Sequence, residues 1–157
     1  MKKINLLLLS VFLIVSCNQN PTQTAITHDH ADMVKSETSV RDGVFIHITE
    51  SYNDPHRVLM PLKMAVMMSM DKDVIVYMDI KAVELLVKSS NDLNFAEFES
   101  AHSYIKQLTD KGVGVYACPT CLKIAGFKPE DLMDGVQVAQ KDKFFSFTKG
   151  KIITLDY

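Results

Sequence analysis

The sequence has little of what marks several large classes of protein. Only 3 of its 157 residues are cysteines, and Lys and Arg (17) do not outnumber Asp and Glu (19). Three cysteines are too few for a disulfide framework, and this balance of charge argues against nucleic acid as a partner. Gly112-x-Gly114 lacks the third glycine of a dinucleotide-binding loop, and Gly150-Lys151 is not a phosphate-binding loop. We therefore expect no cofactor, and the cysteines remain as the strongest chemical signal.

The first sixteen residues predict a cleaved export signal. Lys2 and Lys3 give a positive start, and the apolar run Leu6 to Val15 is too short to cross a bilayer comfortably. The following Ser16-Cys17 resembles the cleavage site of bacterial lipoproteins, in which the cysteine becomes the acylated N-terminus. The alternative is an ordinary secretory signal with a chance cysteine. We expect a signal peptide over 1–16, a lipid anchor in the bilayer at Cys17 and an extracytoplasmic place in the cell envelope.

The rest of the chain divides into a tether and one domain. Residues 17–40 are rich in Asn, Gln, Thr and His and predict a flexible tether. Residues 41–157 alternate apolar runs with helical stretches. The apolar runs predict strands over 43–49, 73–78, 113–117, 136–139 and 152–155.

Helical patterns separate these strands. Asp54-Pro55 gives an N-cap and a proline at the first position of a helix that continues over 58–70. Pro61 is expected to kink this helix or to delay its start. Asn94 and Glu97 resemble a capping box that opens a helix over 95–111. Shorter helical segments are expected over 81–88, 122–126, 129–133 and 141–148. The alternation predicts a three-layer α/β/α sandwich with a mostly parallel five-stranded sheet, flavodoxin-like or Rossmann-like.

The methionines permit two interpretations. The sequence has 9 of them, and five lie at 60, 64, 67, 68 and 70 within one predicted helix. Thioether sulfur suits Cu(I), but packing of a helix on a sheet requires similar spacings. We interpret these methionines as core residues and predict no metal site.

The segment Ala117-Cys118-Pro119-Thr120-Cys121 carries the clearest chemical signal. It places two cysteines three apart between a predicted strand and a short helix. A thiol at such a turn lies at the positive end of the helix dipole, which favours the thiolate and lowers the pKa. One Cys-x-x-Cys pair supplies only two of the four ligands that a structural zinc site needs. We expect Cys118 to be the nucleophile, although a structural disulfide with Cys121 remains an alternative.

Four further residues are expected near the same edge of the sheet. Ligands of parallel α/β sheets bind beyond the carboxyl ends of the strands. Glu50 and Asp79 follow two of these ends, and His56 and Arg57 open the first helix. We predict a polar pocket that includes these four side chains. Each also has a simpler interpretation, as a helix-terminal carboxylate or a solvated residue.

The combined pattern resembles the DsrE/DsrF-like sulfur-relay family. The resemblance is carried by Ala-Cys-Pro-Thr-Cys-Leu, by Asp54-Pro-His-Arg-Val-Leu-Met with its helix and the strand after it, and by the ending Lys143 to Tyr157. It implies a flavodoxin-like sandwich that assembles into trimers or hexamers, with Cys118 carrying sulfur as a persulfide. Cys121 is present in only some relatives. The predicted export departs from the family, whose sulfur-relay members generally work in the cytoplasm.

These observations favour a membrane-anchored protein that handles sulfur, or thiol redox, through Cys118 with Cys121 as the resolving thiol. A protein donor of sulfur or electrons would be a partner. One alternative is a thioredoxin-type oxidoreductase. A second is a non-catalytic oligomeric module that binds a soft metal such as Cu(I), or senses redox state, through the Cys-x-x-Cys pair.

Overall fold

The computed structural model describes residues 40–157. The predicted signal peptide, Cys17 and the tether as far as residue 39 lie outside the described residues. Within 40–157, no helix combines the length and the apolarity that crossing a membrane requires.

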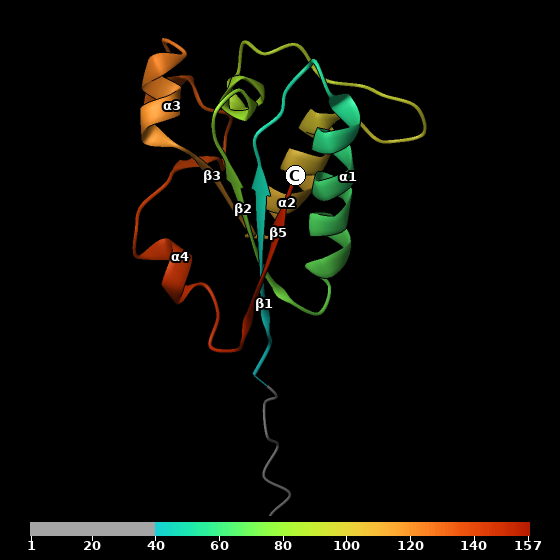
Figure 1. Cartoon of the computed structure of the whole chain (residues 1–157), viewed down its shortest axis with the longest axis vertical. Coiled ribbons are helices and arrows are strands. Elements are labelled where there is room, and N and C mark those ends of the chain that lie inside the picture. Colours follow the sequence, from blue (N-terminus) through green and yellow to red (C-terminus); the bar gives the residue numbers. More distant parts are fainter. Residues whose placement is uncertain (1–39) are drawn as a thin grey trace, which may run out of the picture. The chain divides into compact units, whose positions relative to one another are not determined.

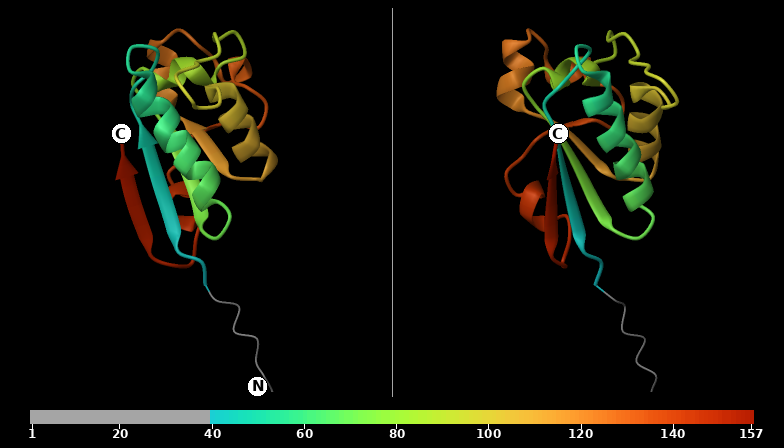
Figure 2. Two further views of the ribbon diagram at one scale, coloured as in Figure 1. Left: turned by 90° about the vertical axis from the view of Figure 1, so that its right-hand side faces the viewer. Right: turned by 45° about the vertical axis from the view of Figure 1, so that its right-hand side comes forward.

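Five parallel strands form a single sheet in the order β4-β3-β2-β1-β5 (Figures 1 and 2). Their bounds are β1 Gly43–Ile48, β2 Asp73–Met78, β3 Gly114–Ala117, β4 Gln137–Val138 and β5 Ile152–Asp156. The sheet with its helices confirms the predicted α/β fold, and all of its strand pairs are parallel. The carboxyl ends of β1, β2 and β3 therefore share one edge of the sheet.

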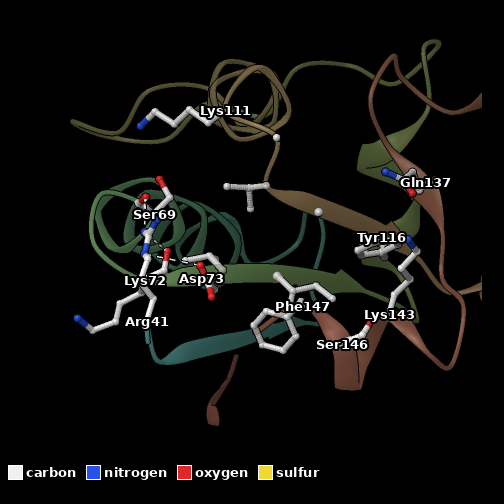
Figure 3. Close-up of a pocket in the computed structure, with 15 residues that line it drawn as sticks. Arg41, Ser69, Lys72, Asp73, Lys111, Tyr116, Gln137, Lys143, Ser146 and Phe147 are labelled. Carbon is white, nitrogen blue, oxygen red and sulfur yellow. Dashed lines mark hydrogen bonds and ion pairs between the residues drawn. The ribbon is translucent and has the colours of Figure 1, made fainter. Parts of the chain in front are cut away.

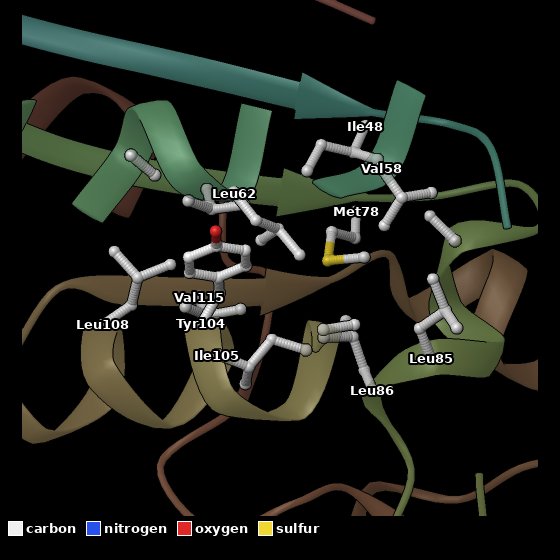
Figure 4. Close-up of a cluster of buried hydrophobic side chains, with 14 of the residues drawn as sticks. Ile48, Val58, Leu62, Met78, Leu85, Leu86, Tyr104, Ile105, Leu108 and Val115 are labelled. Atoms are coloured by element: carbon white, nitrogen blue, oxygen red, sulfur yellow. The ribbon is translucent and has the colours of Figure 1, made fainter. Parts of the chain in front are cut away.

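Two helices cover one face of the sheet and enclose the hydrophobic core. They are α1 (Pro55–Met68) and α2 (Ala101–Asp110), which lie side by side in Figure 1. Leu62 of α1 and Ile105 of α2 are fully buried against Met78 and Val115 of the sheet (Figure 4). Burial of each such side chain contributes about 1.5–3 kcal/mol to the stability of the domain.

The other face carries a thinner layer, with α3 (Pro119–Ile124) and α4 (Lys143–Ser146) on that side (Figure 1). Phe144 of α4 contacts three sheet aromatics edge-on: ring centroids lie 5.5 Å from Phe45, 5.1 Å from Tyr77 and 6.4 Å from Tyr116. Such pairs stabilise beyond their burial. These four aromatic rings lie together on this face of the sheet, and Tyr77 is the member near the carboxyl end of β2.

The prediction of a helix over 95–111 is wrong for its first third, residues 95–100. Residues 91–100 are irregular, and α2 begins only after Ser100, whose hydroxyl accepts a hydrogen bond from the Ser103 N–H at 3.2 Å. The Asn94 side chain does not cap a helix, because it donates to the Asp92 carbonyl at 3.2 Å. A local hydrogen bond thus replaces the expected capping box. The segment over 81–88 forms a 3₁₀ turn, η1, at Ala82–Leu86, and a second turn, η2, spans Pro129–Asp131.

The structure excludes one of the two effects expected of Pro61 and corrects the interpretation of the methionines of α1. The helix begins at Pro55 and continues through the buried Pro61, so Pro61 does not delay its start. Its buried stripe consists of Val58, Leu59, Pro61, Leu62 and Ala65. The methionines lie beside this stripe: Met60, Met67 and Met70 are exposed, and Met68 is only partly buried. The interpretation of these residues as core is therefore wrong for most of them.

Candidate active site

The two cysteines lie at the carboxyl edge of the sheet, where β3 passes into α3. Backbone pairing fixes the turn, because the Cys118 N–H donates to the Met78 carbonyl of the neighbouring β2 at 3.0 Å. Cys118 is the N-cap of α3, and its sulfur accepts a hydrogen bond from the Cys121 N–H at 3.5 Å. Pro119 follows as the first helical residue, a position at which its fixed φ favours a helix. Both thiols are free and partly exposed.

Several donors surround the Cys118 sulfur. Burial by itself raises the pKa of this thiol, but hydrogen bonds from the Tyr77 hydroxyl and from Cys121 outweigh it, and the pKa is lowered. The Thr120 backbone N–H adds to this effect. A lowered pKa increases the thiolate fraction near neutral pH, and the thiolate is the nucleophile.

Cys121 has the opposite tendency. Burial, followed by the hydrogen bond to Cys118, raises the pKa of the Cys121 thiol. Of the two thiols, Cys118 is therefore the one that loses its proton more readily. These opposite directions favour Cys118 over Cys121 as a nucleophile.

The strained residue Ile80 provides a backbone hydrogen bond to Cys121. Ile80 has a φ of 47°, in the left-handed region that a β-branched residue rarely adopts. Its backbone hydrogen-bonds the Cys121 sulfur and lowers the pKa of that thiol, which partly offsets burial. Strain of this kind persists only where the surrounding structure imposes it, and it is concentrated at functional sites. The turn after β2 thus contributes a backbone group to the cysteine pair.

Tyr77 links Cys118 to a histidine between two carboxylates. The rings of Tyr77 and His47 stack with centroids 5.4 Å apart. His47 Nδ1 lies 2.7 Å from Asp156 Oδ1, and Nε2 lies 3.0 Å from Asp79 Oδ1. The second contact is close but poorly aligned, and within the described residues both Nε2 and Asp79 Oδ1 are buried without a hydrogen-bond partner. Burial, followed by the neighbouring Cys118, raises the pKa of Tyr77 above its usual range, so this hydroxyl stays a donor.

The predicted pocket residues are dispersed along this edge. Asp79 lies in the cluster of His47 and the cysteines, where its charge contributes to the raised pKa of Cys121. Glu50 is half-buried and accepts from the Asn53 side chain at 3.1 Å. In the part of the chain that the structure describes, no hydrogen bond or ion pair joins Glu50 to either cysteine.

His56 and Arg57 lie in the first turn of α1 and are exposed. The His56 ring contacts Phe95 and Phe98 of the irregular segment, with centroids 5.9 and 5.5 Å away. The Arg57 backbone N–H donates to the Asp54 carboxylate at 3.2 Å and completes the N-cap of α1. The structure therefore places both residues in the packing and capping around α1, apart from the cluster at Cys118.

Neither Tyr77 nor His47 is among the pocket residues predicted from the sequence. Both lie on the face that Phe45 and Ile75 also share, and strand register places His47 beside Tyr77. The alternation of side chains along β2 could have indicated Tyr77, because Tyr77 and Asp79 are two residues apart and therefore face the same side of the sheet. Within residues 40–157, no group of three or more His, Cys, Asp and Glu side chains is arranged to hold a metal ion.

A cavity of about 370 Å³ opens at the opposite, amino-terminal edge of the sheet (Figure 3). Arg41, Lys72, Asp73, Tyr116 and Lys143 are among the residues that line it, and neither cysteine is. Two of the four cations that line it are paired, Arg41 with Asp73 at 3.6 Å and Lys72 with Asp71. The cysteine pair therefore lies at a partly exposed edge that this cavity does not reach.

Comparison with known proteins agrees with this geometry. No curated protein matches the chain. Three solved structures share its fold. YchN of Escherichia coli has a TM-score of 0.59 and 18% identity over 73% of this chain and 99% of its own. MTH1491 of Methanobacterium thermoautotrophicum has a TM-score of 0.53 and 20% identity over 72% and 98%. BT1422 of Bacteroides thetaiotaomicron has a TM-score of 0.50 and 16% identity over 73% and 95%.

At these identities the three structures establish the fold alone. The family model for DsrE/DsrF-like proteins matches residues 42–149, which is most of the folded domain. This chain belongs to the DsrE/DsrF-like family.

Proposed function

We propose that the protein accepts a sulfur atom on Cys118 and passes it to an acceptor thiol. The observation that carries this proposal is the hydrogen bond that the Cys118 sulfur accepts from the Cys121 N–H at 3.5 Å, together with the lowered pKa of Cys118, to which the Tyr77 hydroxyl contributes. These donors favour the thiolate needed for attack. Membership of a family associated with sulfur relay supports the same chemistry.

Loading and delivery are both exchanges at sulfur. The Cys118 thiolate attacks the outer sulfur of a donor persulfide or polysulfide; a new S–S bond forms, and the donor leaves as a thiolate. In delivery, an acceptor thiolate attacks the outer sulfur of the Cys118 persulfide, and Cys118 leaves as a thiolate. Neither step needs an external oxidant or reductant, and the same donors that favour the thiolate make Cys118 a good leaving group.

Cys121 provides a second way to release the sulfur. Its thiolate attacks the Cys118 sulfur, hydrosulfide leaves with the electron pair, and a Cys118–Cys121 disulfide remains. A dithiol reductant must then open this disulfide before another cycle. The raised pKa of Cys121 delays this reaction until the thiol is deprotonated, so a sulfur acceptor that arrives first receives the sulfur intact.

The proposal includes the setting in which this chemistry occurs. We infer that Cys17 carries a lipid anchor and that the domain works on the outer side of a membrane. There the cysteine pair tends to oxidise, and a partner that supplies sulfur or electrons keeps it active. A trimeric or hexameric assembly is part of the same proposal, on the basis of the family resemblance.

The test measures cyanide-labile sulfur on the full-length protein in detergent. After mild reduction and incubation with polysulfide, we expect about one labile sulfur per chain in the wild type and in Cys121→Ser, and none in Cys118→Ser. Hydrosulfide release without an acceptor should require Cys121. Equal loading of the Cys118→Ser variant would contradict the proposal. Rapid disulfide formation without loading would instead favour thiol redox.

A further inference from the structure

Three methionines at the end of α1 border one shallow hollow. Met64, Met67 and Met68, together with Asp71, line a depression of about 270 Å³, which we call the methionine hollow. Met67 and Met68 lie three and four residues after Met64, so the three side chains are neighbours on the surface of the helix. Unbranched side chains with three rotatable bonds then allow the sulfurs to converge.

Core packing accounts for these three residues only in part. The buried stripe of α1 is complete without a methionine, and the Met67 side chain is 60% exposed. Met68 contacts the core only in part. Met64 makes a polar contact, because its sulfur accepts a hydrogen bond from the Tyr157 hydroxyl at 3.2 Å. This bond fixes the Met64 sulfur beside the hollow and leaves it a second lone pair.

We propose that the methionine hollow binds a soft monovalent cation, Cu(I), through the thioether sulfurs of Met64, Met67 and Met68. Thioethers are soft, uncharged ligands that select Cu(I) over hard divalent cations. The Asp71 carboxylate borders the hollow but pairs with the Lys72 ammonium, so the thioether sulfurs are the ligands that the hollow offers. A single carboxylate gives too few oxygen ligands for calcium or magnesium.

This site is separate from the cysteine pair. The helix α1 runs back along the sheet and ends at Met68, close to the start of β2 at Asp73. Cys118 follows β3 at the carboxyl edge. The two sulfur sites therefore lie toward opposite ends of the parallel strands, and each can be tested without the other.

The test uses Ag(I), which shares the soft character of Cu(I) and has no redox chemistry in water. Full-length protein in detergent carries Cys17→Ser, Cys118→Ser and Cys121→Ser, so that thiolates cannot bind the metal. We expect one equivalent of Ag(I) to bind in calorimetry and to shift the methyl carbon resonances of Met64, Met67 and Met68. Replacing all three by Leu, which conserves volume, should weaken binding at least about tenfold.

A matched control replaces Met60 and Met70, which are exposed but lie outside the methionine hollow. Met60→Leu with Met70→Leu should leave the Ag(I) affinity unchanged. If the triple variant does not fold, Met67→Leu alone must weaken binding, because this exposed residue contributes little to the core. Equal affinity in the Leu variants, or shifts confined to Met60 and Met70, would overturn the proposal. An equal response to Zn²⁺ would overturn it as well.

Discussion

The backbone N–H of Cys121 points at the sulfur of Cys118 from 3.5 Å. The spacing of the pair makes this contact possible, because a residue three positions into a helix can donate to the N-cap side chain. The sulfur of Cys118 therefore takes the place of the oxygen that usually caps a helix. The same hydrogen bond that begins α3 also stabilises a thiolate at Cys118, so local folding and reactivity depend on one contact.

Loss of the Tyr77 hydroxyl should make Cys118 less reactive. In Tyr77→Phe the ring still contacts Phe144, while the hydrogen bond that lowers the pKa of Cys118 is absent. The pKa should rise, and alkylation by iodoacetamide at pH 7 should slow by about three- to tenfold. The measurement is the pH profile of alkylation in a Cys121→Ser background. Tyr116→Phe, on the neighbouring strand, is the matched control and should leave the profile unchanged.

The lowered pKa of Cys118 also predicts how stability changes with pH. Between the folded pKa and the ordinary thiol pKa of about 8.5, the unfolded chain holds a proton that the folded protein has released. The free energy of unfolding should therefore rise with pH across this window, and the gain is lost as pH falls through the folded pKa. Urea unfolding of Cys121→Ser from pH 6 to 9 should show the rise.

The additional Cys118→Ser change should flatten that pH dependence. Cys121 needs to be absent from both proteins because its raised pKa has the opposite sign: its contribution is present at low pH and is lost as pH rises through the folded pKa. Identical slopes in the single and double variants would show that Cys118 does not ionise more readily in the folded state.

Relief of strain at Ile80 should stabilise the protein. This residue is 59% exposed and has a φ of 47°, so Ile80→Asn loses little buried surface and gains a side chain that tolerates this conformation. We expect the free energy of unfolding to rise by about 1 kcal/mol in urea. Ala96→Asn, at the same φ in the irregular segment, should give a gain of the same sign. A destabilised Ile80→Asn would mean that the isoleucine side chain, and not the backbone, is required there.

The core under α1 should dominate stability. Leu62 is fully buried between the helix and the sheet, and Leu62→Ala should cost about 2–5 kcal/mol by denaturant unfolding. Met60→Ala, on the exposed side of the same helix, should cost about 1 kcal/mol or less. Similar losses at the two positions would contradict the division of α1 into a buried stripe and an exposed methionine face.

Local signals in the sequence predicted much of the fold. The apolar run from Asp73 to Met78 matches the bounds of β2, and Asp54-Pro55 marks the true start of α1. The expected capping box at Asn94 failed because a side chain that can cap a helix can equally bond its own neighbours, and tertiary packing decides between them.

The site was less predictable than the fold, for a related reason. Cys118 and Cys121 are only three residues apart in sequence, so their spacing alone indicated their contact. Tyr77 reaches Cys118 from another strand, and His47 reaches Tyr77 from a third. Such contacts depend on strand order and register, which no local pattern specifies. The same limit explains the methionines of α1: spacing showed that they share a helix but not which side of it the core occupies.

The most direct test of the account is to locate the transferred sulfur by tandem mass spectrometry. Wild-type protein, Cys118→Ser and Cys121→Ser would be reduced, incubated with polysulfide, alkylated and digested. The account predicts one added sulfur atom, about 32 Da, on Cys118 in the wild type and in Cys121→Ser, and none on Cys121 in Cys118→Ser. Sulfur found on Cys121 alone, or on neither cysteine in any protein, would contradict it.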